Sequence, residues 1–136
     1  MDKAGKAVQE RFAQRYYSSI GYGLNITATS LIDSRNPMSF LMANSLDNST
    51  VVSQLYKPEE LPLQKLADNP LLSENLSGIS PFKIDSIITM FNKKIEEISV
   101  LASFKTGDLI AVEIAESRSI EIGSKLEFGE LSFKIK

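Results

Sequence analysis

The N-terminal part of the chain changes from a helical to a strand-like pattern of apolar residues. Apolar residues first return every fourth position, which places them on one face of a helix, at Val8, Phe12, Tyr16 and Ile20. Gly21 and Gly23 follow, and apolar and polar residues then alternate over residues 24–29, as in a half-buried strand. The pattern predicts an amphipathic helix over residues 4–20, a glycine turn and a short strand.

The middle of the chain is divided by turn-forming residues, at Asn36-Pro37, Asp47-Asn48, Pro58, Pro62, Asn69-Pro70 and Ser80-Pro81. Residues 38–43 and 50–56 each contain enough apolar residues for a short helix or a strand. Pro58, followed by two glutamates, indicates the start of a helix. Residues 64–75 are typical of either a short helix broken at Pro70 or a loop.

From Phe82 onward, large apolar and β-branched residues become dense. The pattern predicts a strand over residues 84–91 that is apolar on both faces, a short helix over residues 95–101 and a turn at residues 105–108. Alternation then predicts three strands, over residues 109–114, 119–122 and 131–136, with turns or bulges at Gly123 and Gly129. The expected fold class is α+β, with an N-terminal α/β segment over residues 1–81 and a small β module over residues 82–136.

Composition excludes several classes of chemistry. The 136 residues include no Cys, His or Trp, which rules out Cys/His zinc sites, thiol nucleophiles, disulfides and Ser-His-Asp triads. A net charge of -2 lacks the basic character that nucleic-acid binding requires. The adjacent acids at residues 59–60 and 96–97 would diverge on a helix and so would not form a catalytic pair. We therefore expect no catalytic residue, no cofactor, no metal site and no nucleic-acid partner.

The sequence also bears on location. No apolar run reaches the roughly eighteen residues of a membrane span, and Glu10, Arg11 and Arg15 interrupt any signal-peptide core near the N-terminus. The lack of cysteine favours the cytoplasm. We expect a cytoplasmic protein with no direct membrane insertion.

The predicted order of elements in residues 82–136 resembles the SpoA-type module of the flagellar motor switch and type III secretion cytoplasmic-ring family. The family's Ile-x-x-Ile-x-x-Leu helix matches residues 95–101, and its Gly-Asp-hydrophobic-Ile strand start matches residues 107–110. Residues 120–131 are similar to its strand, glycine turn and next strand, and Glu10-Arg11-Phe12-Ala13 is similar to the opening of the middle domain of the larger switch protein. The Glu-x-x-Asn motif of the related phosphatases does not occur. The resemblance implies a structural role in a ring.

Residues 82–136 carry more large apolar residues than so small a module can bury, which predicts association with a second copy or a relative. The family's modules intertwine as dimers. Strand alternation selects a predicted interface core of Ile88, Met90, Ile110, Val112, Ile120 and Phe133. The predicted charged rim consists of Lys93, Lys94, Glu113, Glu116, Arg118 and Glu121. The alternative is a monomer in which the N-terminal helix covers one face of the module.

These patterns lead to an expected function. We expect a non-enzymatic scaffold subunit of a flagellar switch or type III secretion cytoplasmic ring, located at the cytoplasmic face of a membrane-embedded machine. By resemblance, its partners would be itself, related ring modules and the regulator of the export ATPase. Two alternatives stay open: a phage or other bacterial structural assembly subunit, and a small acid-dependent enzyme or ligand-binding domain.

Overall fold

The structure is a computed structural model of residues 1–136, and it describes residues 1–73 and 82–136. It mixes helices and strands, as expected for the α+β class. The helices are η1 (Glu10–Arg15), η2 (Thr29–Leu31), α1 (Met38–Asn44), η3 (Pro58–Glu60), α2 (Leu63–Ala67), α3 (Pro70–Ser73) and α4 (Ile84–Leu101). The strands are β1 (Gly23–Asn25), β2 (Thr50–Val52), β3 (Lys125–Phe128) and β4 (Leu131–Lys134).

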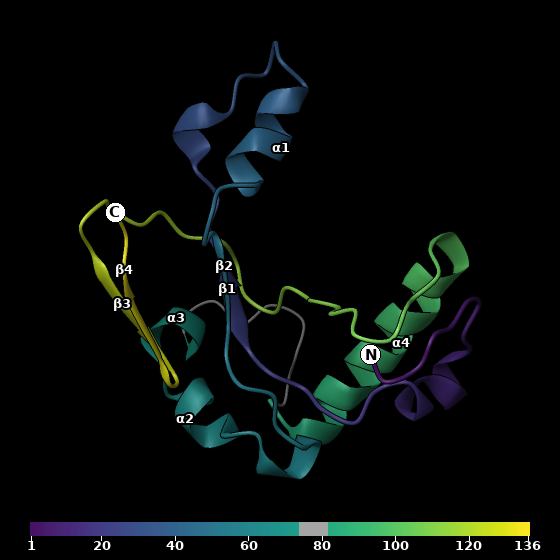
Figure 1. Ribbon diagram of the computed structural model, residues 1–136. Helices are drawn as coiled ribbons and strands as arrows, with labels where there is room; N and C mark the ends of the chain where they lie inside the picture. Colours follow the sequence, from purple (N-terminus) through teal and green to yellow (C-terminus); the bar gives the residue numbers. More distant parts are fainter. Residues whose placement is uncertain (74–81) are drawn as a thin grey trace.

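The elements follow an open curve (Figure 1). Helix α4, with the N-terminal segment beside it, forms one arm, and the β3–β4 hairpin with α2 and α3 forms the other. The β1–β2 pair lies between the arms, and the segment that joins these two strands projects away from the rest of the chain.

The predicted helix over residues 4–20 is wrong, because only η1 is helical there and it is a short 3-10 helix. Before η1, Gly5 pairs with Phe104 through two backbone hydrogen bonds. The Gly5 amide donates to the Phe104 carbonyl at 3.2 Å, and the Phe104 amide donates to the Gly5 carbonyl at 2.8 Å. Ala7 has a positive φ of 51°, which a continuous helix does not allow. Two residues of the fourfold series, Val8 and Ile20, are buried with Ile95 and Ile87 of α4, so their spacing reflects tertiary packing rather than a local helix.

The predicted strand over residues 84–91 is also wrong, because these residues and the predicted short helix at 95–101 form one helix, α4. Its buried residues Ile87, Ile95 and Ser99 are separated by multiples of four, which is the spacing of one helical face. The β-branched residues favoured a strand locally, but tertiary packing on that face outweighs such a preference. Ile88 and Met90 therefore lie on a helix and not on one face of a strand.

The remaining strand predictions are confirmed in part. β1 pairs with β2 in antiparallel register, but it covers only the start of residues 24–29. β4 confirms the start of the strand at 131–136, and it pairs with the unpredicted β3 across a turn at Gly129, where φ is 62°. Residues 109–114 and 119–122 form no strand, because their backbone joins no ladder among the described residues.

Several turn predictions are confirmed. Gly107 has a φ of 93°, and the Asp108 carboxylate accepts a hydrogen bond from the Lys105 amide at 2.7 Å, which closes the turn at 105–108. Residues 38–43 are helical as α1, and a 3-10 helix begins at Pro58. Of the two alternatives for residues 64–75, the structure has the helix broken at Pro70, although residues 74 and 75 lie outside the described residues.

In residues 1–73 and 82–136 the buried apolar residues form three clusters, and each cluster joins residues from both sides of the predicted boundary between residues 81 and 82. The first contains Val8, Ala13, Ile95 and Phe104; the second Tyr22, Leu66, Leu72 and Phe128; the third Ile20 and Ile87. The two predicted segments therefore share their buried surface, and the boundary itself stays a prediction.

Candidate interaction surfaces

The segment that joins β1 to β2, residues 26–49, forms a projecting unit that we call the lobe (Figure 1). Its base is closed by a hydrogen bond from the Ile26 amide to the Ser49 carbonyl at 2.7 Å. Higher up, the Ala28 amide donates to the Ala43 carbonyl at 3.0 Å, and η2 packs against α1. These contacts make the lobe a defined helical hairpin on the end of a two-stranded sheet.

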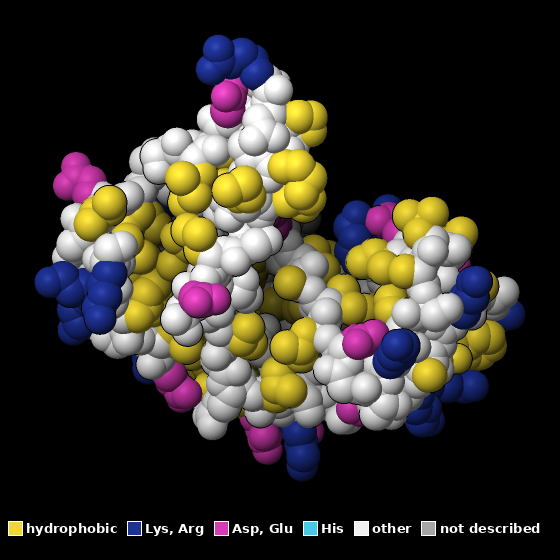
Figure 2. Space-filling view, turned by 45° about the horizontal axis from the view of Figure 1, so that its top comes forward, with side chains coloured by type: hydrophobic (Ala, Val, Ile, Leu, Met, Phe, Trp, Pro, Cys, Tyr) yellow, Lys and Arg dark blue, Asp and Glu magenta, His cyan; other side chains and the backbone are white. Residues whose placement is uncertain are grey.

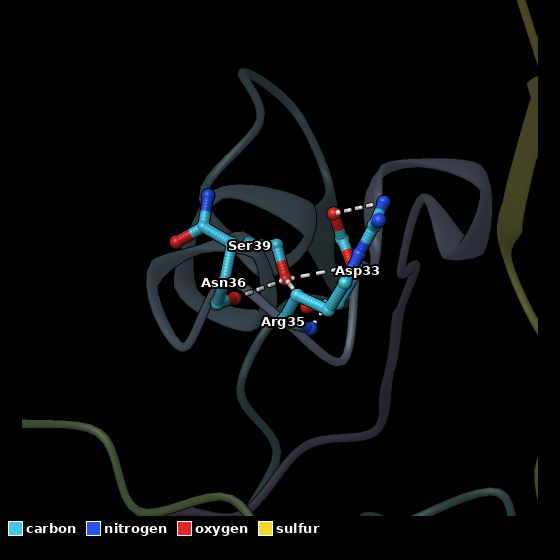
Figure 3. A network of polar contacts seen from close by, with 4 residues as sticks. All are labelled: Asp33, Arg35, Asn36 and Ser39. Atoms are coloured by element: carbon cyan, nitrogen blue, oxygen red, sulfur yellow. Dashed lines mark hydrogen bonds and ion pairs between the residues drawn. The ribbon is translucent and has the colours of Figure 1, made fainter.

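A buried serine holds the far end of the lobe together. The Ser39 hydroxyl accepts a hydrogen bond from the Asp33 amide at 2.9 Å, and it lies 2.6 Å from the Asn36 carbonyl, to which it donates (Figure 3). Asp33 and Arg35 form an exposed ion pair beside it, with the Arg35 Nε 3.2 Å from an Asp33 carboxylate oxygen. The hydrogen bonds from Arg35 lower the pKa of the Asp33 carboxyl below its usual range.

Helix α1 buries its small residues and exposes its large ones. Ser39 and Ala43, four positions apart, form the buried stripe. The large side chains that cover the rest of the helix are each between 55 and 60% exposed: Met38, Phe40, Leu41 and Met42. Three more large apolar side chains of the lobe are exposed, namely Leu31, Ile32 and Leu46. Figure 2 shows hydrophobic side chains gathered on the projecting part of the molecule.

This arrangement reverses the usual relation between a surface helix and its core. A helix of a soluble domain normally turns its large apolar residues inward. Contiguous exposed apolar patches above a few hundred Å² are rare on monomers and mark binding sites. The lobe therefore has the character of a docking element.

A second apolar surface lies where α4 ends, and we call it the α4-end groove. It is an open depression of about 360 Å³ lined mainly by apolar side chains, including Ile98, Phe104, Leu109 and Ile110. Leu101, 87% exposed, lies at the end of α4, where Val100 is also exposed, and Leu109 itself is largely exposed. Asp108 is the charged residue among those that line it.

The predicted interface core does not form one face. Ile88 and Met90 are half-buried and lie two positions apart on α4, so they point to different sides of the helix. Ile110 and Val112 are half-buried in the irregular segment after α4, where Ile110 lines the α4-end groove. Ile120 is exposed on a segment without a strand. These residues were selected because they alternate along predicted strands. Of the six, only Phe133 lies on a strand, where it pairs with Leu126 across the β3–β4 hairpin. Their role in an interface stays a prediction.

Most of the predicted rim residues lie on the surface. Lys93, Glu113, Glu116, Arg118 and Glu121 are exposed, and Lys94 is half-buried. Lys94 Nζ lies 2.6 Å from a carboxylate oxygen of Glu97 one helical turn away, and this hydrogen bond lowers the pKa of the Glu97 carboxyl. The Arg118 guanidinium donates to the Pro70 carbonyl at 3.4 Å. Their place at the rim of an interface stays a prediction.

Sequence reasoning missed the lobe as a functional surface. It identified a short element at residues 38–43 but assigned the excess of apolar surface to residues 82–136. No local signal could have found it, because the large apolar residues around Ser39 and Ala43 would be expected to face the core of a soluble domain.

The acid-dependent enzyme alternative has one candidate location. An open groove of about 610 Å³ between η1 and α4 is lined by Gln9, Glu10, Arg11, Asn92 and Glu96, so two carboxylates share it. Catalytic carboxylates act in sites that exclude water, and this groove is open to solvent.

Within residues 1–73 and 82–136, no group of three or more acidic side chains is placed to hold a metal ion. No described helix has both the length and the hydrophobicity needed to cross a bilayer.

Comparison with known proteins does not place the chain in a family. No family model matches it, and no curated protein and no solved structure gives a significant match.

Proposed function

We propose that this chain is a non-enzymatic scaffold subunit that acts through protein–protein association. The resemblance of its C-terminal sequence motifs indicates a cytoplasmic ring of the flagellar switch or type III secretion type as the assembly. In that setting the subunit works at the cytoplasmic face of a membrane-embedded machine. Its partners are further copies of itself, related ring modules and the regulator of the export ATPase.

The observation that carries the proposal is the exposed apolar face of α1. Four large side chains, those of Met38, Phe40, Leu41 and Met42, are more than half exposed on a single seven-residue helix. Burying a large apolar side chain contributes roughly 1.5–3 kcal/mol, so a partner that covers these four gains several kcal/mol. Such a gain is of the size that drives specific association once the cost of ordering two partners is subtracted.

The distribution of charge fits association better than catalysis. On α4, Lys94 and Glu97 form an ion pair at the surface. Charged pairs of this kind at a rim favour one orientation of a partner over others.

The test is the solution mass of the full chain, measured by light scattering over a range of concentrations. The full chain is needed because every core cluster joins residues on both sides of residue 81. We expect a mass above that of the monomer that increases with concentration. A monomer at all concentrations would overturn the scaffold proposal.

A second measurement tests the ring assignment separately. The chain is mixed with a purified SpoA-type ring protein, and the mass of the mixture is compared with that of each component. A complex of defined stoichiometry supports the ring assignment. If the chain self-associates but ignores the ring protein, the ring assignment fails while the scaffold proposal stands.

A further inference from the structure

The outer face of helix α1 is apolar, uncharged and centred on Leu41. At about 100° per residue, Leu41 lies opposite the mean direction of Ser39 and Ala43, which form the buried stripe of the helix. Met38, three positions before Leu41, lies on the same side of the helix. None of the seven residues of α1 is charged. The helix therefore exposes a neutral apolar face at the side of the projecting lobe (Figure 1).

We propose that this face forms a two-fold contact between two copies of the chain, in which the lobe of one copy packs against the lobe of the other. This inference rests on the proposed function, because it names the surface through which the subunit associates with itself. In a two-fold contact the same surface lies on both sides, so each residue near the axis meets its own copy. Leu41 therefore packs against the Leu41 of the second copy.

The charges of the lobe fit a contact with its own copy. A charge near a two-fold axis faces an identical charge, and like charges in an interface cost several kcal/mol, so the centre of such a contact has to be neutral. The lobe has three charged residues, Asp33, Arg35 and Asp47, and none of them lies on α1. Asp33 and Arg35 already pair with each other. A partner recognised by its charge would find no charge on this helix, whereas a second copy needs none.

The exposed apolar area matches what a stable dimer needs. With roughly 150–200 Å² for each fully exposed large apolar side chain, the seven large side chains of the lobe, which are 43 to 60% exposed, present about 600 Å² on each copy. Two lobes thus present about 1,200 Å², whereas a specific interface of about 1,600 Å² contains about 1,000 Å² of apolar area. Two lobes can leave about a sixth of their apolar area uncovered and still supply this amount.

No other described part of the chain gathers as much exposed apolar surface. The lobe carries seven of the fourteen large apolar side chains that are exposed among the described residues. The remaining seven are spread over β2, the residues after it, the end of α4 and residues 109–122. Of the large apolar side chains that line the α4-end groove, only Leu109 is largely exposed. The largest apolar surface that one copy offers to the lobe of another is therefore a second lobe.

A lipid bilayer fits the lobe less well than a second copy does. The turn between η2 and α1, at the end of the lobe farthest from the sheet, carries the ion pair of Asp33 and Arg35 (Figures 1 and 3). The lobe would enter a bilayer with this charged end first, and charges inside the hydrocarbon region are costly. Helices that lie in a membrane surface are rich in Lys and Arg on their polar face, whereas the lobe has no Lys and a single, paired Arg.

A charge exchange at Leu41 tests the contact. Leu41→Asp and Leu41→Lys each bring like charges together across the two-fold axis. Each should weaken self-association, measured by light scattering, by roughly thirtyfold or more. An equimolar mixture of the two variants brings opposite charges together, so it should restore association to within about tenfold of the wild-type chain. Leu41 is more than half exposed, so the fold should tolerate both substitutions.

Leu101→Asp is the matched control, because Leu101 is also an exposed leucine but lies outside the lobe. It should leave the association unchanged. If the wild-type chain associates but Leu41→Asp does not weaken the association, the proposal fails and the scaffold function stands. If both Leu41 variants are monomeric and their mixture stays monomeric, Leu41 contacts a different surface and the proposal is wrong. A wild-type chain that is monomeric at all concentrations overturns the scaffold function as well.

A cysteine at the same position gives an independent readout. The chain has no cysteine, so a disulfide of Leu41→Cys can form only between two copies. Packed helices lie about 8–10 Å apart with Cα atoms about 2.3 Å from each axis, so two facing Cα atoms come within roughly 3.5–5.5 Å, a range that overlaps the about 4.4–6.8 Å of a disulfide. Under mild oxidation Leu41→Cys should form a covalent dimer faster than Leu101→Cys. Equal rates would contradict the two-fold contact.

Circular dichroism and thermal unfolding of each variant show whether the fold is retained. If a charged variant at Leu41 is misfolded, the cysteine variant decides the question, because it introduces no charge. Sedimentation with phosphatidylcholine and phosphatidylglycerol vesicles tests the bilayer. Vesicle binding by a wild-type monomer that is lost in Leu41→Asp would overturn the proposal in favour of a lipid surface.

Discussion

The lobe differs from the rest of the described chain, which we call the base, in the exposure of its apolar side chains: the lobe exposes most of its large ones, whereas the base buries many of them. Among the residues whose burial the structure describes, eleven hydrophobic ones are buried and only Ala43 of these lies in the lobe, although the lobe contains seven of the fourteen exposed large ones. Each region also contains a buried serine that ties two segments together. Ser99 joins α4 to the N-terminal segment by accepting the Val8 amide hydrogen at 2.8 Å, and Ser39 joins α1 to the turn before it.

The two serines share one role but differ in their surroundings. Ser99 is fully buried beside the first apolar cluster, so its hydrogen bonds add to a core that is already packed. Ser39 is also buried, but its hydrogen bonds go to backbone groups of Asp33 and Asn36, and no residue of the lobe belongs to the three apolar clusters. The base is therefore stabilised by apolar packing, whereas the lobe is shaped by hydrogen bonds and leaves its large apolar side chains exposed.

The largest effect should come from shortening a core side chain of the base. Ile95, which belongs to the first cluster, is almost fully buried, so Ile95→Ala should lower the free energy of unfolding by about 2–5 kcal/mol. Leu41→Ala in the lobe should change it by less than about 0.5 kcal/mol, since that side chain is exposed. Urea unfolding, followed by circular dichroism at a concentration where the chain is monomeric, measures both. Equal losses would break the distinction between base and lobe.

The two serines should differ next. Ser99→Ala leaves the buried Val8 amide without its acceptor and should cost about 1–3 kcal/mol. Ser39→Ala removes the acceptor of the partly buried Asp33 amide and should cost about 0.5–1.5 kcal/mol, and only within the lobe. Amide hydrogen exchange separates the two: Ser39→Ala should speed exchange at Asp33 and leave Val8 unchanged. Faster exchange at Val8 in that variant would mean that the lobe and the base unfold together.

High pH should weaken the base rather than the lobe. Burial raises the pKa of Tyr56 to about 12, and this residue stacks on Tyr22 with the ring centroids 6.2 Å apart. A tyrosine in the unfolded chain ionises near pH 10, so Tyr56 stays protonated to a higher pH in the folded state than in the unfolded state. The stability that this shift contributes is present below pH 10 and is lost as the pH rises from 10 toward 12. Tyr56→Phe should make unfolding less dependent on pH in that window, as measured by urea unfolding at pH 9 and pH 11. An unchanged dependence would show that Tyr56 is not responsible.

The smallest effect should come from the exposed ion pair of the lobe. Arg35→Gln removes the hydrogen bonds that lower the pKa of the Asp33 carboxyl, so this pKa should rise to its usual range in a carbon-13 NMR titration. Because the folded pKa is lowered, the contribution of the pair is present above the unfolded pKa of about 4 and is lost as the pH falls through the folded value. The pair is exposed to solvent, so we expect no measurable change in unfolding at pH 7. A clear loss of stability at pH 7 would show that the pair supports the base.

Local chemistry explains which features could be predicted from the sequence. Gly107 and Gly129 occupy positive-φ positions that glycine adopts without strain, and Pro70 interrupts the helical region before it. Such features depend on the residue itself and on its close neighbours. The strand at the C-terminus was predictable for a similar reason, because its alternation is preserved in the half-buried and exposed residues of β4.

The helix α4 and the N-terminal segment could not be predicted in this way. The β-branched residues near Ile87 favour a strand, and the fourfold apolar spacing around Phe12 favours a helix, yet both local preferences are reversed. Such preferences amount to less than about 1 kcal/mol per residue. Packing of Val8 and Ala13 against Ile95 buries several large side chains and exceeds them.

The exposed apolar surface also depends partly on composition and partly on tertiary contacts. The chain's residue types by themselves determined that Cys and His chemistry is excluded and that the net charge is slightly negative, and they predicted more large apolar residues than residues 82–136 alone can bury. Only the tertiary structure decided where the excess is exposed: on α1, whose small residues Ser39 and Ala43 take the buried side, and at the end of α4. The physical reason is that composition sets how much apolar surface must be covered, whereas contacts between residues distant in sequence decide which part of it the chain covers itself.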